Sequence, residues 1–200
     1  MKKLVLLAVC LCVSVGFVKA QKVEGTLSFL KQCEELNVVF DYKGMMIKKQ
    51  TEKEYVAEKV KEKNKEKKGQ GDEWKTEWET TTRDFIQSAF LKDFNAEFAG
   101  MGLEAGEFPE AEYVATVKTT WLDPGFMAGP MSKPSSVSVE VVFKKKNSST
   151  VLAKVTINKA KGSLYDFGNL YAGDERRIGS SYGEAAQDLG KLVAKTLKKK

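Results

Sequence analysis

The sequence predicts an α+β fold, in which a mostly antiparallel sheet of about five strands has two or three helices covering one face. Segments 137–143 and 151–157 alternate apolar with other residues on either side of a polar turn, a pattern typical of a β-hairpin. Between residues 74 and 98, apolar residues recur at steps of three and four, as they do on one face of a helix. The helical segments are grouped instead of alternating with strands, which favours an antiparallel sheet covered on one side.

Residues 1–20 have the layout of a secretory signal peptide, with two lysines, a ten-residue apolar run and a small residue at the end. We therefore expect cleavage between Ala20 and Gln21, which leaves residues 21–200 as a single exported domain. The apolar run is shorter than the about 20 residues that a membrane-spanning helix needs. No later run approaches that length, so we expect no transmembrane span in the mature chain.

The chain contains no histidine, which excludes Ser-His-Asp and Cys-His catalysis and zinc sites with histidine ligands. Cys10 and Cys12 lie in the leader without the small residues that precede a lipid-acceptor cysteine, so a lipid anchor is the less favoured alternative. Cys33 is then the one cysteine of the mature chain, and we expect no disulfide and an inert thiol. Motifs for phosphate, dinucleotide, zinc and calcium sites are missing, so we expect no cofactor and no metal.

Short runs of β-branched and aromatic residues predict two strands, at 23–31 and 36–43. Residues 51–68 mix lysine and glutamate at helical spacing, which predicts a charged helix whose first two turns dock and whose remainder projects. Asp72 is suited to cap the next helix. We interpret the apolar stripe of that helix as core: Trp74, Trp78, Phe85, Ile86, Ala89, Phe90, Phe94 and Phe98.

A strand at 112–122 precedes the hairpin, and a last helix follows it. Ser181, with Glu184 three positions later, forms a capping box that predicts the start of this helix. Its expected buried face comprises Ala185, Ala186, Leu189, Leu192, Val193 and Leu197. Much of the net charge of +6 lies at its end, because five of the last ten residues are lysine. We expect these lysines to contact an anionic surface peripherally.

Three segments carry a likeness to a known group: YVATVKTTWLDPGF at 113–126, SVSVEVVFKKKNSSTVLAKVTI at 136–157 and DERRIGSSYGEAAQDLGKLVAKTLKK at 174–199. They resemble small exported envelope proteins of Gram-negative bacteria, with a domain similar to the α/β domain of the TolB N-terminal region and of curli-secretion-type lipoproteins. The resemblance implies an accessory or assembly role in the envelope and assigns no reaction. It also implies a closing helix that packs on the sheet with Tyr182, Gly183, Ala186, Gly190 and Leu192.

Two segments are candidates for binding a partner. The first, at 121–131, places Trp121, Phe126, Met127 and Met131 among turn-forming residues, as functional loops on a scaffold do. In the alternative interpretation, its aromatic side chains pack against the sheet edge and its prolines only direct the chain.

The second candidate segment combines tyrosines with adjacent arginines. Tyr171, Arg176 and Arg177 are suited to hold a carboxylate, a phosphate or the face of a sugar. Alternatively, the arginines pair with Asp174 and Glu175, their neighbours in the sequence.

Together these features predict an exported, non-enzymatic protein of the periplasm or cell surface that binds another envelope protein or a glycan. Export and the lack of a recognised module disfavour nucleic acid as a partner. The alternative function is a small hydrolase that acts on glycan through two carboxylates, drawn from Glu107, Glu110, Asp123, Asp166 and Asp174. The hydrolase requires two acids in one concave pocket, whereas the binding module exposes an apolar loop or a strand edge.

Overall fold

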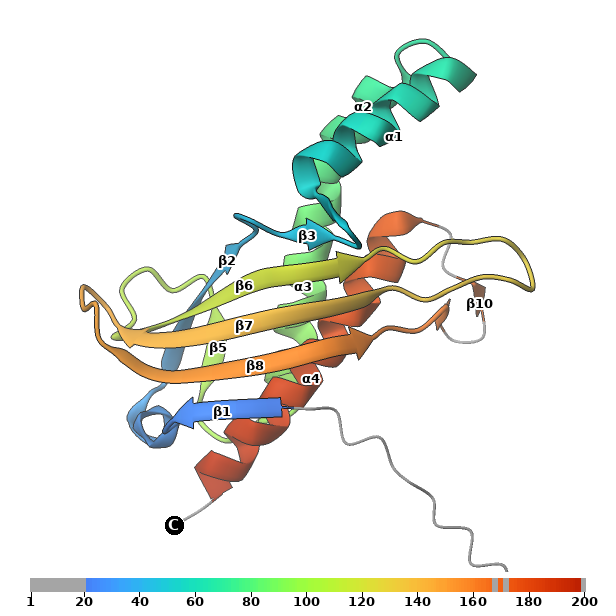
Figure 1. The fold of residues 1–200 in the computed structure, drawn as a ribbon. Helices are drawn as coiled ribbons and strands as arrows, with labels where there is room; N and C mark the ends of the chain where they lie inside the picture. The colour runs from blue at the N-terminus through green and yellow to red at the C-terminus, as the bar shows by residue number, and fades with distance from the viewer. Residues whose placement is uncertain (1–20, 167–168, 171–172, 199–200) are drawn as a thin grey trace, which may run out of the picture.

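The structure is a computed structural model that describes residues 21–166, 169–170 and 173–198 (Figure 1). Three features of the sequence lie outside the described residues: the expected leader with Ala20, the candidate Tyr171, and the last two lysines.

Eight strands form the main sheet, in the order β1-β8-β7-β6-β2-β5, with β3 paired to β6 and β4 paired to β3. A separate pair, β9 (Tyr165–Asp166) and β10 (Asn169–Leu170), follows β8. The strand expected at 23–31 is shorter than predicted, because the 3-10 helix η1 (Ser28–Gln32) occupies its second half. The strands of the main sheet are β1 (Gln21–Gly25), β2 (Glu35–Asp41), β3 (Met46–Ile47), β4 (Gln50–Thr51), β5 (Glu104–Gly106), β6 (Tyr113–Asp123), β7 (Ser136–Lys145) and β8 (Val151–Lys161).

The longest strands of the sheet are antiparallel. β6, β7 and β8 form a meander, and β1 pairs with β8 in the antiparallel direction. β2 runs parallel to both β5 and β6, because the chain between them crosses over through helices. The predicted fold class is confirmed. The strand count exceeds five because β3, β4 and β5 have only two or three residues each and are too short to show a period.

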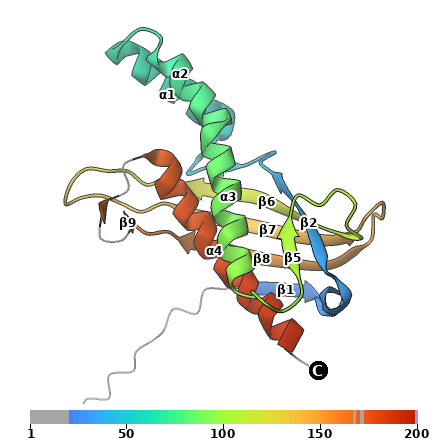
Figure 2. The same cartoon turned by 180° about the vertical axis from the view of Figure 1, so that it is seen from behind.

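Two helices cover one face of the sheet, and two others project beyond it. α3 (Thr81–Ala96) and α4 (Asp174–Lys198) pack against each other across the sheet, as Figure 2 shows. α1 (Glu52–Glu66) and α2 (Gln70–Glu79) form a helical hairpin, here called the arm, that extends away from the sheet at the top of Figure 1. The helix layer therefore lies on one side of the sheet.

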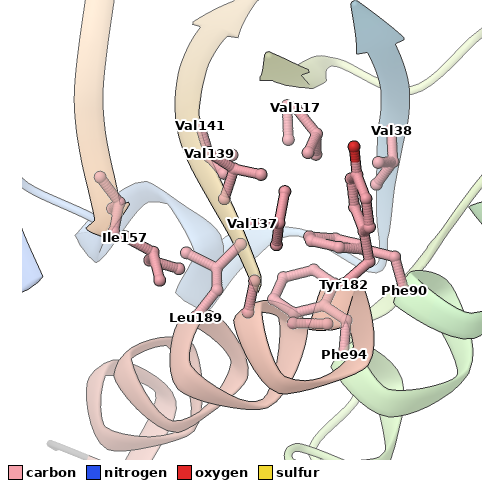
Figure 3. Packing of buried hydrophobic residues seen from close by; sticks show 14 of the residues in the cluster. Val38, Phe90, Phe94, Val117, Val137, Val139, Val141, Ile157, Tyr182 and Leu189 are labelled. Atoms are coloured by element: carbon pink, nitrogen blue, oxygen red, sulfur yellow. The ribbon is translucent and has the colours of Figure 1, made fainter. Parts of the chain in front are cut away.

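Aromatic and aliphatic side chains fill the space between the helices and the sheet (Figure 3). Phe90 and Phe94 of α3 and Leu189 of α4 pack with Val117 of β6 and Val139 of β7, and these five side chains are almost completely buried. Burial of one such side chain contributes about 1.5–3 kcal/mol relative to leaving it exposed. This packing holds the helix layer on the sheet.

Tyr182 joins α4 to the sheet through a buried hydrogen bond. Its hydroxyl lies 2.7 Å from the Oγ1 of Thr119 on β6, and both residues are fully buried. Burial raises the pKa of Tyr182, so its hydroxyl stays protonated through the ordinary pH range.

Gly190, in contrast, faces α3 and not the sheet, since a Cβ there would lie 2.7 Å from the Cβ of Glu97. Gly183 faces α3 in the same way, beside Asp93, so these glycines serve helix-helix contact.

The aromatic stripe belongs to two helices, and the prediction of one continuous helix is wrong. The chain breaks at Thr80, whose backbone (φ −118°, ψ −85°) is not helical. Trp74 and Trp78 therefore pack on Tyr55 of the arm, with ring centroids 6.1 and 5.6 Å away. Phe85 is 37% exposed, at the outer surface of α3. Steps of three and four residues continue across such a break, which is why the pattern did not reveal it.

The predicted start of the last helix is also wrong. α4 begins at Asp174, and Ser181 lies inside the helix, where its hydroxyl donates to the carbonyl oxygen of Ile178 at 2.8 Å. A capping box forms instead at the start of α1, between Thr51 and Glu54. The same residue types therefore cap a helix at one position and sit in a helix interior at the other.

Hydrogen bonds fasten the arm at its base and at its tip. At the base, the carboxylate of Glu52 accepts from the indole N–H of Trp78 and from the guanidinium of Arg83, each at 2.9 Å. At the tip, the side-chain oxygen of Asn64 accepts from the backbone N–H groups of Gly69 and Gly71, at 3.0 and 2.9 Å. The arm is thus an ordered extension with its own small aromatic cluster.

Replacement of Gly71 by alanine is expected to open the arm. A Cβ at this position would lie 2.3 Å from the carbonyl oxygen of Val60, so α2 must move away from α1 at a cost of about 1–3 kcal/mol. Hydrogen exchange read by mass spectrometry should become about tenfold faster in the arm and stay unchanged in α3 and α4. Thr76→Ala, at an exposed position of α2, is the control. Unchanged exchange in the arm of Gly71→Ala would contradict the role of this close approach.

Candidate functional site

The connection between β6 and β7, residues 124–135, continues the two strands as a narrow ribbon beyond the end of the sheet (Figure 1). We call it the tip loop. The N–H of Phe126 donates to the carbonyl oxygen of Lys133 at 3.0 Å, and the N–H of Lys133 donates back at 2.9 Å. Further out, the N–H of Met131 donates to the carbonyl oxygen of Ala128 at 3.2 Å. The loop is therefore ordered by its own backbone.

Three apolar side chains of the tip loop face solvent. The exposed fractions are 44% for Phe126, 36% for Met127 and 76% for Met131. Tyr165, on the β9–β10 pair that projects from the same end of the sheet, is 55% exposed. An ordered loop with several exposed apolar side chains is a surface suited to contact a partner.

Trp121, which the sequence groups with these residues, lies at the base of the loop. It is half-buried, and its indole N–H donates to the carbonyl oxygen of Lys48 at 3.0 Å. The ammonium of Lys159 lies 5.7 Å from the centroid of its ring. Trp121 therefore packs at the sheet edge, as the alternative interpretation expects, whereas Phe126 does not.

A buried carboxylate, that of Asp123, anchors the base of the tip loop. It contacts the ammonium of Lys133 at 2.5 Å, the N–H of Gly125 at 3.0 Å and the ammonium of Lys48 at 3.8 Å. Burial alone raises the pKa of Asp123, but the hydrogen bonds from Lys133 and Gly125 and the two lysine charges outweigh it and hold the pKa below its usual range. Sequence reasoning missed the anchoring role of Lys133, although a lone lysine after a charge-free loop is a usable signal.

Arg177 attaches both ends of the tip loop to the first turn of α4. Its Nε donates to the carbonyl oxygen of Pro124 at 2.8 Å, and its guanidinium pairs with Asp174 at 2.5 Å. At the other end of the loop, the hydroxyl of Ser135 donates to the carbonyl oxygen of Arg177 at 2.6 Å. Arg177 is only 3% exposed, so in this structure it positions the loop.

Arg176 has a different environment, because adjacent residues of a helix point about 100° apart. It is exposed and lines a groove of about 340 Å³ between α3 and α4, together with Phe85 and Lys92. The structure therefore separates the two arginines that the sequence places together.

The carboxylates considered for hydrolysis whose side chains the structure describes do not meet in an enclosed pocket. Asp123 and Asp174 are each held by a basic side chain of the loop base. Glu110 is 93% exposed and pairs with a lysine at 2.9 Å, and Glu107 is exposed. The side chain of Asp166 lies outside the described ones. Despite burial, the pKa of Asp123 is lowered by its contacts with Lys133 and Gly125, whereas the acid of a glycosidase needs a raised pKa.

Cys33 lies in a shallow groove of about 440 Å³ among several glutamates, including Glu112. Its thiol is half-buried and donates to the carbonyl oxygen of Phe29 at 3.2 Å. Burial, assisted by the charge of Glu112, raises the pKa of Cys33 to about 11. A thiol with this pKa is a weak nucleophile at neutral pH.

Over the described ranges, no three cysteine, aspartate or glutamate side chains are arranged to hold a metal ion. Within the same residues, no helix combines the length and apolar character needed to cross a membrane.

The chain matches no protein-family model and no curated protein. Similar solved structures include two of the PelC dodecamer from Paraburkholderia phytofirmans. One is 8% identical and covers 84% of this chain and 96% of that chain, with a TM-score of 0.41. The other, of a point variant, is 12% identical and covers 90% and 96%, also with a TM-score of 0.41. A neuraminyllactose-binding hemagglutinin homolog from Helicobacter pylori is 15% identical and covers 83% and 84%, with a TM-score of 0.34. These neighbours are bacterial proteins, and the TolB and curli-type resemblance stays an expectation.

Alkylation of Cys33 by iodoacetamide is expected to be at least about tenfold slower in the folded protein than in the unfolded chain at pH 8. The reason is that the thiolate forms near pH 11 in the folded state and near pH 8.5 in a free cysteine. Mass spectrometry with and without denaturant measures the two rates. Equal rates would contradict the protected thiol.

Asp123→Asn is expected to lower the melting temperature most at neutral pH. The pKa of Asp123 is lowered in the folded state, so its stabilising effect is present above the unfolded pKa of about 3.9 and is lost as the pH falls through the folded value. A loss of about 1 kcal/mol lowers the melting temperature by about 2–4 °C in a chain of this size. Thermal melts from pH 7 down to pH 2 should show the two proteins converging in acid. A constant difference would contradict the ionised anchor.

Proposed function

We propose that this chain is an exported, non-enzymatic binding protein of the bacterial cell envelope, which docks on another envelope component through the tip loop. The observation that carries the proposal is the exposure of Phe126, Met127 and Met131 on a loop ordered by its own hydrogen bonds. Such a loop loses little conformational freedom when it binds, which favours affinity.

The polar contacts at the base of the loop support this role, because they hold the loop in one position. Asp123 and Arg177 are buried and hold the loop from below and from α4. Residues that hold a loop in this way pre-organise the side chains at its end. The apolar side chains at the end have no comparable role in the core, since they remain exposed.

The export step of the proposal rests on the leader. Cleavage between Ala20 and Gln21 would leave the sheet intact, because β1 begins at Gln21 and pairs with Ile157 from its first residue. The mature chain would then retain every strand of the sheet.

Removal of the exposed apolar groups should release the protein from the envelope. We expect Phe126→Ser combined with Met131→Ser to reduce the envelope-bound fraction at least about tenfold, a loss of about 1.4 kcal/mol or more. Cell fractionation with quantitative immunoblotting measures it. Val151→Ser, at a 51% exposed valine where β8 begins, is the matched control. Unchanged envelope binding of the double variant would refute the tip loop as the docking element.

A further inference from the structure

We propose that the envelope component bound by the tip loop is the anionic surface of a phospholipid bilayer, an inference that rests on the proposed function. The first argument is charge. Residues 124–132 contain no charged side chain, so the end of the loop can enter the interfacial layer of a bilayer without moving a charge into it.

The second argument is backbone hydrogen bonding. In hydrocarbon or close to it, an unpaired backbone N–H is costly, whereas at a protein surface a partner can supply the acceptor. Most N–H groups of the loop already have acceptors in the loop or at its base: those of Gly125, Phe126, Ala128, Met131, Ser132 and Lys133. Pro130 has no N–H to satisfy, and the hydroxyl of Ser132 donates to the carbonyl oxygen of Gly129 at 2.7 Å. Most backbone N–H groups of the loop therefore need no hydrogen-bond acceptor from the surrounding medium.

The third argument is the set of cations at the same end of the sheet, here called the basic rim: Lys159, whose ammonium lies over the ring of Trp121, Lys161, which pairs with Ser136 at the start of β7, and Arg176 in the first turn of α4. All three are exposed. Lys133 is not counted with them, because its charge is paired with that of Asp123, and Asp174 is paired with Arg177. Cations close to anionic headgroups contribute about 1 kcal/mol each. The apolar side chains at the end of the loop would meet the apolar interior side of the interface, and the cations behind them would meet the anionic headgroups.

The C-terminal lysines offer a competing contact at the other end of the molecule. α4 ends at the far end of the sheet from the tip loop (Figures 1 and 2). An 11-residue strand such as β8 spans about 35 Å, which is several times the Debye length of about 8 Å at physiological salt. A bilayer that the tip loop enters end-on therefore lies beyond the reach of the lysine charges, and the two contacts can be tested separately.

Vesicle flotation of the purified mature chain, residues 21–200, tests the inference, with phosphatidylcholine vesicles that contain or lack phosphatidylglycerol. We expect binding to the anionic vesicles, with affinity at least about tenfold weaker for the neutral ones. Phe126→Ser with Met131→Ser should abolish binding, and Lys161→Gln with Arg176→Gln should weaken it and flatten its salt dependence. Val151→Ser should bind as the original protein does. Because all substituted side chains are exposed, circular dichroism should show unchanged folding.

A second measurement locates the contact. In Phe126→Trp, fluorescence quenching by brominated lipid should exceed that of the original protein, because the three native tryptophans, Trp74, Trp78 and Trp121, lie outside the tip loop. Substitution of Lys191, Lys195 and Lys198 by glutamine should leave binding intact. Loss of binding in this variant alone would overturn the inference and assign lipid contact to the C-terminal end.

If tip-loop substitution releases the protein from the envelope but vesicles do not bind the original protein, the inference fails and the proposed function stands. If vesicles bind through the tip loop while envelope binding is unaffected by its substitution, the proposed function fails.

Discussion

The buried guanidinium of Arg177 is the contact on which the tip-loop end of this molecule depends. It bonds to Pro124 at one end of the tip loop, while its own carbonyl oxygen accepts from Ser135 at the other end. The guanidinium also forms an ion pair with Asp174, three residues earlier in the first turn of α4. An enclosed arginine is costly unless it is paired and hydrogen-bonded, and here these requirements are met by groups that the loop and the helix share. The position of the tip loop and the start of α4 are therefore one structural feature.

The helix layer supports this arrangement from one side of the sheet. α3 contributes aromatic rings such as Phe90 and Phe94, while α4 contributes smaller residues and Tyr182, so the two helices fit closely. Gly190 allows this approach because any side chain there would meet α3. The arm takes no part in that layer, since its aromatic residues pack on one another. The arm and the tip loop are thus two separate extensions of one core.

Much of the fold could be predicted from local patterns, and the failures have specific physical causes. The hairpin of β7 and β8 follows from strict alternation, because each strand has one buried and one open face. The break at Thr80 was missed because the apolar spacing continues through it, although the rings then face different partners. The start of α4 was missed because Asp174 and Arg177 stabilise it through the tip loop, a contact that no local rule contains. The short β3 was missed because it is defined only by its pairing with β6.

The sequence by itself determined the class of the fold, the lack of histidine chemistry, and the presence of an apolar loop without charge. Only the tertiary structure decided which of its aromatic residues is exposed, since Trp121 finds the carbonyl oxygen of Lys48 and Phe126 finds no comparable pocket. It likewise decided that Arg177 is enclosed while Arg176 remains on the surface. The physical reason is that periodicity reports which face of an element is apolar, whereas exposure depends on what distant parts of the chain place against that face.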